Sequence, residues 1–277
     1  LMIRRPPRSS PLYSAAASYV YKRQIIYYNL FKETMALNLP TRQERFIEES
    51  LIFPRSGMVY QVRGGGLSGK LMRPFAEAWV ALTLAQGEYV HWIDGACRFD
   101  PSRIMKHFPK NLSQPEQLLH GLFVGRGFTV HQFTHLIDRL VDEIRITKAK
   151  LIVVDGPITM HLDTQVIDYE ARSLLRKSMK NLTKIATKHR VSVVVVTALR
   201  ANSKRLRDLL ALVTNRCNAT LSGQYKNYMG KRKLWLLHLP SGSSGFQYEL
   251  SKQETLSQST SRIIHSRLAY EGAGEIE

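Results

Sequence analysis

One stretch of this sequence has residue types and spacing that could bind phosphate. It fits the pattern G-x-x-x-x-G-K-[ST] at every fixed position except the last, and it consists of Gly64, Gly65, Gly66, Leu67, Ser68, Gly69, Lys70 and Leu71. In such a loop backbone N–H groups surround phosphate oxygens, and the lysine reaches the outer phosphates. The closing Ser or Thr normally holds Mg²⁺ through its hydroxyl, which Leu71 lacks. The sequence therefore predicts a phosphate loop in which metal placement, and with it hydrolysis, is in doubt.

The residues around this loop supply the elements that must position it. Residues 58–62 predict a short buried strand before the loop, and apolar residues at helical spacing follow it, at Phe75, Ala78, Trp79 and Leu82. Further along, residues 151–155 form an apolar run of β-formers that ends in the carboxylate of Asp155. This is the form of a Walker B strand, whose aspartate usually orients the Mg²⁺ shell.

Strand and helix patterns alternate through residues 57–199. Further strands are expected at 89–94, 119–124 and 191–197, and helices after Asp100, after Thr129 and over 163–189. This alternation predicts an α/β fold with a mostly parallel central sheet flanked by helices. Three later segments, 220–225, 234–239 and 246–250, predict consecutive strands that are antiparallel at the C-terminal end of the sheet.

The ends of the chain differ in composition from the middle. Residues 1–24 resemble translated sequencing-adapter sequence and are interpreted as non-biological; they carry five cations and no acid, so the rest remains strongly basic. Residues 25–50 are interpreted as a linker or a remnant, 51–250 as the core, and 251–277 as a polar, flexible tail.

Composition narrows the class of protein. The chain has 277 residues, 44% of them hydrophobic, which suits a globular protein, and its net charge of +18 favours nucleic acid over an anionic membrane as partner. Cys97 and Cys217 are too few and too distant for a disulfide framework, and no apolar stretch approaches the length of a membrane helix. A soluble intracellular protein is expected, cytoplasmic or, in a eukaryote, nuclear.

Two basic segments are candidate DNA contacts. The first contains Arg200, Lys204, Arg205 and Arg207, and the second contains Lys231, Arg232 and Lys233, with Lys226, Tyr225 and Tyr228 nearby. Cations suit phosphate contact, and interleaved aromatic residues add base stacking. A third set recurs every four residues, at Arg172, Arg176, Lys180, Lys184 and Lys188. The alternative for all three sets is an ordinary solvated surface.

The order of these motifs resembles the core ATPase domain of the RecA/RadA recombinase family, in particular its archaeal and eukaryotic paralogues. The likeness covers about residues 50–250. Beyond the phosphate loop and the Asp155 strand, it rests on Pro54-x-x-Gly57, Ile93-Asp94 with Phe99-x-Pro101-x-Arg103-Ile104, His131-Gln132, Ile185-Ala186 before the strand ending in Thr197, and His238-Leu239-Pro240 ahead of Phe246.

The departures from the family pattern fall on residues that do chemistry. Besides Leu71, the position of the family's water-polarising glutamate is Ala96, and the γ-phosphate sensor position is Leu199. Where the family usually places an acidic residue near a neighbour's nucleotide, this chain has Trp235. No catalytic residue is therefore assigned, and hydrolysis is expected to be slow or absent.

The resemblance implies a paralogue in homologous recombination and DNA repair. It would bind ATP through Gly64 to Leu71 and Asp155, with Mg²⁺ held through the nucleotide and Asp155, and it would bind DNA, expected to be single-stranded, or recombinase subunits. One alternative is an active DNA-stimulated ATPase in which Asp94, Asp100 or another acid replaces the missing glutamate. Another is a nucleotide-free scaffold subunit of a recombinase complex.

Overall fold

The computed structural model describes residues 47, 51–108, 114–228 and 230–247, all within the unit that begins at Arg45. The expected ends of the chain, 1–24, most of 25–50 and 251–277, lie outside the described residues. The strands are β1 Val59–Gly64, β2 Val90–Asp94, β3 Leu122–Arg126, β4 Leu151–Asp155, β5 Ser192–Ala198, β6 Ala219–Tyr228, β7 Lys231–Leu239 and β8 Ser244–Phe246. The α-helices are α2 Arg73–Ala85, α3 Pro101–Met105, α4 Val130–Thr147, α5 Asp168–His189 and α6 Lys204–Thr214, and short 3₁₀ helices cover η2 Leu67–Gly69, η3 Pro115–Gly121 and η4 Thr159–Leu162.

The strands form one mixed sheet in the order β3-β2-β4-β5-β1-β6-β7-β8. Pairing is parallel from β3 to β6, and β7 and β8 add antiparallel partners at the far end. The predicted α/β fold class is confirmed. β4 is buried along its whole length, as an unbroken apolar run between two covering layers should be.

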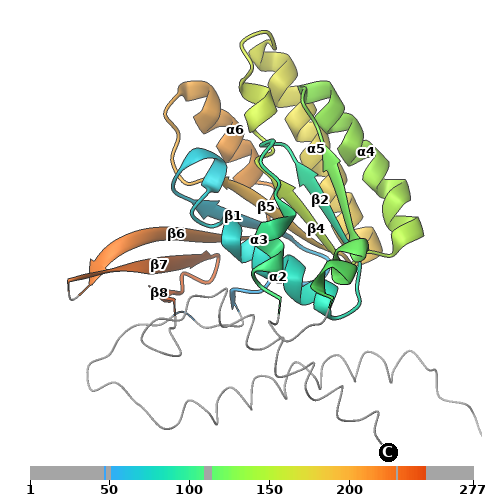
Figure 1. Cartoon of the computed structure of the whole chain (residues 1–277). Coiled ribbons are helices and arrows are strands. Elements are labelled where there is room, and N and C mark those ends of the chain that lie inside the picture. The colour runs from blue at the N-terminus through green and yellow to red at the C-terminus, as the bar shows by residue number, and fades with distance from the viewer. Residues whose placement is uncertain (1–46, 48–50, 109–113, 229, 248–277) are drawn as a thin grey trace, which may run out of the picture. The chain divides into compact units, whose positions relative to one another are not determined.

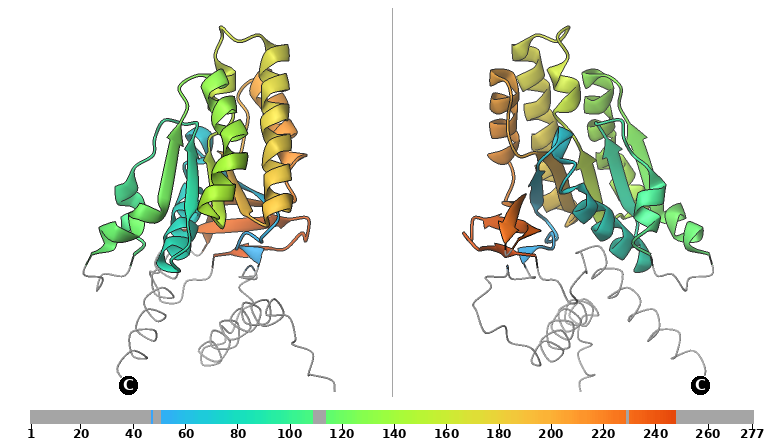
Figure 2. Two further views of the ribbon diagram at one scale, coloured as in Figure 1. Left: turned by 90° about the vertical axis from the view of Figure 1, so that its right-hand side faces the viewer. Right: turned by 60° about the vertical axis from the view of Figure 1, so that its left-hand side comes forward.

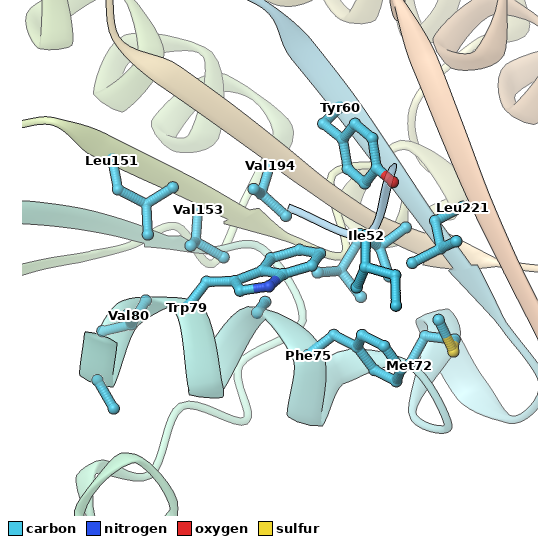
Figure 3. Packing of buried hydrophobic residues seen from close by; sticks show 14 of the residues in the cluster. Ile52, Tyr60, Met72, Phe75, Trp79, Val80, Leu151, Val153, Val194 and Leu221 are labelled. Carbon is cyan, nitrogen blue, oxygen red and sulfur yellow. The ribbon is translucent and has the colours of Figure 1, made fainter. Parts of the chain in front are cut away.

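Helices cover both faces of the sheet (Figures 1 and 2). On one face, α2 and α3 pack on a core that contains Trp79, Trp92 and Phe75. In Figure 3 the Trp79 ring lies between its helix and the sheet residues Val153 and Val194. On the other face, α4, α5 and α6 close a second core. The parallel strands are thereby fixed in register, and the carboxyl ends of β1, β2, β4 and β5 meet at one edge.

Helix ends follow the local signals in the sequence. Asp100 accepts a hydrogen bond from the backbone N–H of Ser102 at 3.0 Å, and Thr129 accepts one from that of Gln132 at 3.2 Å. Both predicted caps are therefore present. None of the helices in the described part of the chain combines the length and apolar character needed to cross a membrane.

Several boundaries differ from expectation, and β6 and β7 are longer than expected, at Ala219–Tyr228 and Lys231–Leu239. The strand expected at 119–124 begins at Leu122, because η3, which opens at Pro115, takes up the preceding residues. The helix expected from residue 163 begins at Asp168, since η4 and an Asp163 turn precede it. The strand expected at 246–250 appears as β8, Ser244–Phe246, and its residues beyond 247 lie outside the described part.

Helix α6 was missed in the sequence. The basic run after β5 was considered only as a candidate DNA contact, yet Ser203 accepts a hydrogen bond from the backbone N–H of Leu206 at 3.1 Å and caps a helix of 11 residues. The signal was present, because Leu206, Leu209, Leu210 and Val213 recur at helical spacing. The cations of this segment therefore project from a helix as well as from a loop.

His161 lies in η4, just beyond the end of β4, and is fully buried. Its Nδ1 lies 2.9 Å from the carbonyl oxygen of Pro157, and its ring meets Phe133 edge to face. Burial lowers the pKa of His161 to about 4, with the hydrogen bond to Pro157 raising it and the charge of Arg205 lowering it further. The ring is therefore neutral in the folded protein at pH 7.

This burial predicts an acid-sensitive fold. The unfolded state binds a proton at His161 below about pH 6.5 and the folded state only near pH 4, so stability falls as the pH drops through this window. Urea unfolding should be measured at about pH 7 and at about pH 5. The free energy of unfolding that is lost between these pH values should be about 2 kcal/mol larger in the parent than in His161→Asn. The asparagine amide can replace the Nδ1–H donor, and other buried histidines contribute equally to both proteins. Equal pH dependence would contradict the prediction.

Candidate functional site

The glycine loop connects β1 to α2 and is folded into a tight turn. The N–H groups of Gly69, Lys70 and Leu71 donate to carbonyl oxygens of Gly66, Leu67 and Gly65, at 3.2, 3.1 and 3.0 Å. These bonds stay within the loop, although such N–H groups would surround a phosphate in an open phosphate loop. The Lys70 side chain is exposed.

The loop packs directly on the end of β5. Gly69 has φ +83°, and a Cβ atom built on it would lie 2.2 Å from the carbonyl oxygen of Thr197. Only glycine meets both demands, so this position is fixed by the backbone contact as well as by the motif.

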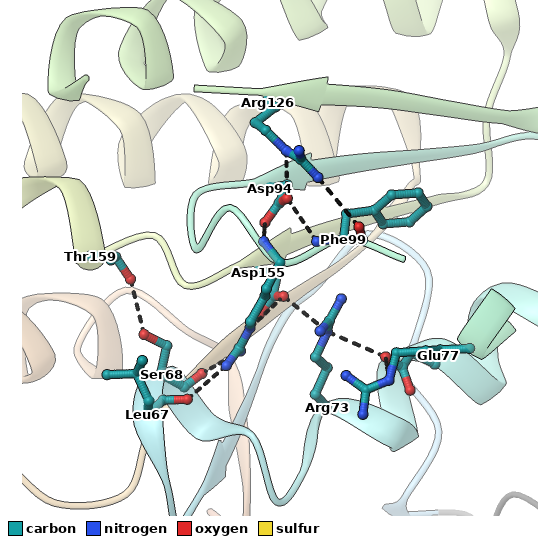
Figure 4. Close-up of polar contacts among 11 residues, drawn as sticks. Leu67, Ser68, Arg73, Glu77, Asp94, Phe99, Arg126, Asp155 and Thr159 are labelled. Atoms are coloured by element: carbon teal, nitrogen blue, oxygen red, sulfur yellow. Dashed lines mark hydrogen bonds and ion pairs between the residues drawn. The ribbon is translucent and has the colours of Figure 1, made fainter. Parts of the chain in front are cut away.

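Asp155, at the end of β4, is the centre of the site and has no exposed surface. Arg98 reaches both of its carboxylate oxygens, with Nε 3.0 Å from Oδ2 and Nη2 2.6 Å from Oδ1. Arg73 Nε lies 3.0 Å from Oδ2 on the other side (Figure 4). Two guanidinium groups therefore neutralise the carboxylate that was expected to orient Mg²⁺.

The same arginines join Asp155 to the surrounding elements. Arg98 also donates from Nη1 to the carbonyl oxygen of Leu67 at 2.7 Å and from Nη2 to that of Ser68 at 2.9 Å. Arg73, itself buried, lies 3.3 Å from Glu77, which is also 3.6 Å from Arg103. The glycine loop, α2 and the loop after β2 all meet at one carboxylate.

Burial acts on the charges of this cluster in opposite directions. Burial lowers the pKa of Arg73, and the charges of Asp155 and Glu77 oppose this shift. Burial raises the pKa of Glu77, and the charges of Arg73 and Arg103 oppose that shift. Buried ions of this kind are stable together and costly apart, because removal of one partner leaves an uncompensated charge. The cluster is therefore a structural unit.

The two acids considered as substitutes for the missing glutamate have structural partners. Asp94 is buried and accepts hydrogen bonds from the backbone N–H groups of Arg98 and Phe99, at 3.2 and 2.9 Å, and from Arg126 Nε at 2.9 Å. Asp100 caps α3. Ala96 lies against Gly156 and has no polar side chain to offer a water molecule. Neither carboxylate is placed as a free base.

A magnesium ion does not fit the residues at this site. Leu71 has no oxygen ligand, and both oxygens of Asp155 already accept from guanidinium groups. A metal ion at Asp155 would meet the positive charge of Arg98 and Arg73 at close range. We therefore assign no metal-dependent step to these residues.

The predicted DNA residues after β5 fall into two groups. Arg200, Lys204 and Arg207 are exposed. Arg205 instead donates to the carbonyl oxygen of Val166 at 2.7 Å and lies 3.2 Å from Asp168, so it holds the segment before α5. Its role in the described structure is to connect α6 with α5.

The second basic segment forms part of a two-stranded ribbon, β6–β7, which extends away from the helices (Figure 1). Lys226 lies opposite Lys233, and its Nζ is 3.8 Å from the centroid of a Trp235 ring. Arg232 lies 4.5 Å from the Tyr225 ring centroid. Trp235 thus supports a cation and packs against Phe246, a role missed when its position was considered only as a lost acid.

Two cavities of about 310 and about 330 Å³ flank the glycine loop. The first lies between the loop, η4 and α6, and includes Arg200, Thr159 and Leu206. The second includes Gly64, Gly65, Gly66, Leu71, Leu199, Arg200, Tyr225 and Arg232. Arg200 and Arg232 come from the two separate basic segments, so these segments meet beside the loop.

The Asp155 cluster predicts a large effect of a substitution that keeps the shape of the side chain and removes its charge. Asp155→Asn removes the only negative charge that Arg98 contacts among the ion pairs of the described residues. Urea unfolding without nucleotide or metal should show that this substitution lowers the free energy of unfolding by about 3–5 kcal/mol, the usual cost of breaking a buried ion pair.

The matched control is Asp142→Asn, because Asp142 is exposed and lies 3.9 Å from Arg145. This control should change the free energy of unfolding by less than about 0.5 kcal/mol. A similar small change in both variants would show that the Asp155 cluster does not stabilise the fold.

A comparison with known families supports the same assignment as the fold. Residues 80–211 match the Rad51 family model. The matched stretch runs from within α2 to within α6 and contains β2, β3, β4 and β5, so it includes Asp155, Asp94 and Arg98. Together with the parallel sheet and the loop between β1 and α2, this match supports membership of the RecA/RadA recombinase family.

Proposed function

We propose that this chain is a recombination and repair subunit that binds single-stranded DNA without turning over ATP. Its family supports a recombinase-like role. The observation that carries the finer proposal is that Arg200 and Arg232, from two distant basic segments, line one cavity beside aromatic Tyr225. A continuous cationic surface with an aromatic ring suits a flexible strand that presents both phosphates and bases.

The ribbon supplies both kinds of contact that single-stranded DNA needs. Lys231 and Arg232 are exposed, and Tyr225 keeps 47% of its surface accessible. The stacking of Arg232 on Tyr225 and of Lys226 on Trp235 restricts these long side chains before any ligand arrives. Binding therefore costs less side-chain entropy than it would on a surface of free lysines.

The catalytic part of the proposal rests on the disabled nucleotide site. Leu71 lacks the hydroxyl that holds Mg²⁺, Ala96 lacks a carboxylate, and Asp155 is engaged by arginines. Loss of one such catalytic group typically lowers the rate by about 10² to 10³. Recombinase subunits remain proposed partners, since a subunit without turnover would act through what it binds.

The DNA surface can be tested by fluorescence anisotropy with a labelled oligothymidylate at several salt concentrations. The triple variant Lys231→Ala, Arg232→Ala, Lys233→Ala should bind at least about tenfold more weakly. The slope of log affinity against log salt should fall by about 2, because three phosphate contacts are lost.

The matched control removes the same charge elsewhere, through Arg145→Ala, Lys148→Ala and Lys150→Ala at the end of α4. These three side chains are exposed and belong to none of the basic sets considered for DNA. The control should bind as the parent does. Equal losses in both triple variants would show that only net charge matters, and unchanged binding by the ribbon variant would contradict the proposed surface.

Turnover is a separate measurement. Phosphate release with ATP, Mg²⁺ and oligothymidylate should not exceed that of Lys70→Ala. Steady turnover that Lys70→Ala abolishes would instead support the active DNA-stimulated ATPase. Failure to bind DNA, combined with retained binding to a recombinase, would favour the scaffold alternative.

A further inference from the structure

We propose that the Arg98 side chain is the resident cation of the nucleotide site and keeps the glycine loop closed to Mg²⁺-bound nucleotide. The guanidinium binds the carboxylate that a metal would need and the backbone of the loop that a phosphate would need. This inference concerns the catalytic half of the proposed function and is independent of DNA binding.

The hydrogen bonding of Arg98 is nearly complete. Of the five N–H donors of a guanidinium, four are used: two toward Asp155, one toward Leu67 and one toward Ser68. The bonds to Asp155 form a two-pronged contact, the geometry that arginine and carboxylate favour. A lysine, with one nitrogen, could not span the same acceptors.

The loop that carries Arg98 is held in place by Asp94 and Arg126. Asp94 accepts from the backbone N–H groups of Arg98 and Phe99, and Arg126 connects to Asp94 and to the carbonyl oxygen of Phe99. Cys97 adopts φ +51°, which turns the chain sharply just before Arg98. The side chain is therefore positioned by a preorganised turn and not by a chance rotamer.

The glycine loop is shaped to receive this cation. Carbonyl oxygens of Leu67 and Ser68 face the guanidinium, and these partial negative charges would repel a phosphate. Ser68 has φ +46° and ψ +32°, unusual for a residue with a side chain, and its hydroxyl lies 2.9 Å from that of Thr159. The loop is thus held from β5, from the turn after β2 and from η4.

Nucleotide binding would have to compete with these contacts. Phosphate entry would require the carbonyl groups to turn away and Arg98 to leave Asp155. The apparent affinity for nucleotide is lowered by the small fraction of molecules in which this opening has occurred. Loss of the Arg98 side chain should raise that fraction and so make the glycine loop accessible to nucleotide.

The test is a titration of the full chain with a fluorescent ADP analogue in excess Mg²⁺. The parent should bind the analogue weakly, and Arg98→Ala should bind it at least about tenfold more tightly than the parent. The added substitution Lys70→Ala should remove this gain. The control is Arg139→Ala, which removes an exposed guanidinium that pairs with Glu143 and should behave as the parent.

Each outcome bears on the proposal. Binding by the parent as tight as that of Arg98→Ala, or no binding by either, would overturn it. If Arg98→Ala does not fold, Arg98→Lys provides the same comparison, because it retains charge but loses the bridging bonds; binding equal to the parent would again overturn it. Oligothymidylate binding by the same preparations should be unchanged. A failed nucleotide result can thereby be told apart from a failure of the proposed DNA surface.

Discussion

The negative charge of Asp155 is the constraint on which the arrangement of the site depends. A carboxylate without exposed surface at the end of a central strand requires a cation close by. Here the cations are guanidinium groups from α2 and from the turn after β2. Because both side chains also bind other elements, the position of the glycine loop, the start of α2 and the turn containing Arg98 follow from the balance of one charge.

Much of the fold was predictable because it follows from local patterns. The run at 151–155 is β4 to the residue, since a short unbroken apolar run of mostly β-branched residues favours a strand between two covering layers. Asp100 and Thr129 cap helices as their types suggested. Helix α6 was missed because attention went to its cations and not to the spacing of its leucines.

The chemistry of the site was only half predictable. The loss of ligands at Leu71 and Ala96 could be stated from residue types alone. The replacement contacts could not, because Arg98 and Asp155 are 57 positions apart and meet only through the adjacency of β2 and β4. Likewise, counting cations after β5 did not distinguish Arg205, which has structural partners, from Arg200, which is exposed beside two cavities.

A cation supplied by the chain itself differs from one taken from solution, because its effective concentration is constant. Enzymes that cycle between nucleotide states convert the energy charge of the cell into changes of shape. If Arg98 stays bound to Asp155 and to the loop, as we propose, the corresponding edge of this sheet would keep one shape whatever the ratio of ATP to ADP. In a mixed assembly, such a subunit would be a fixed reference surface beside neighbours whose contacts change with each round of hydrolysis.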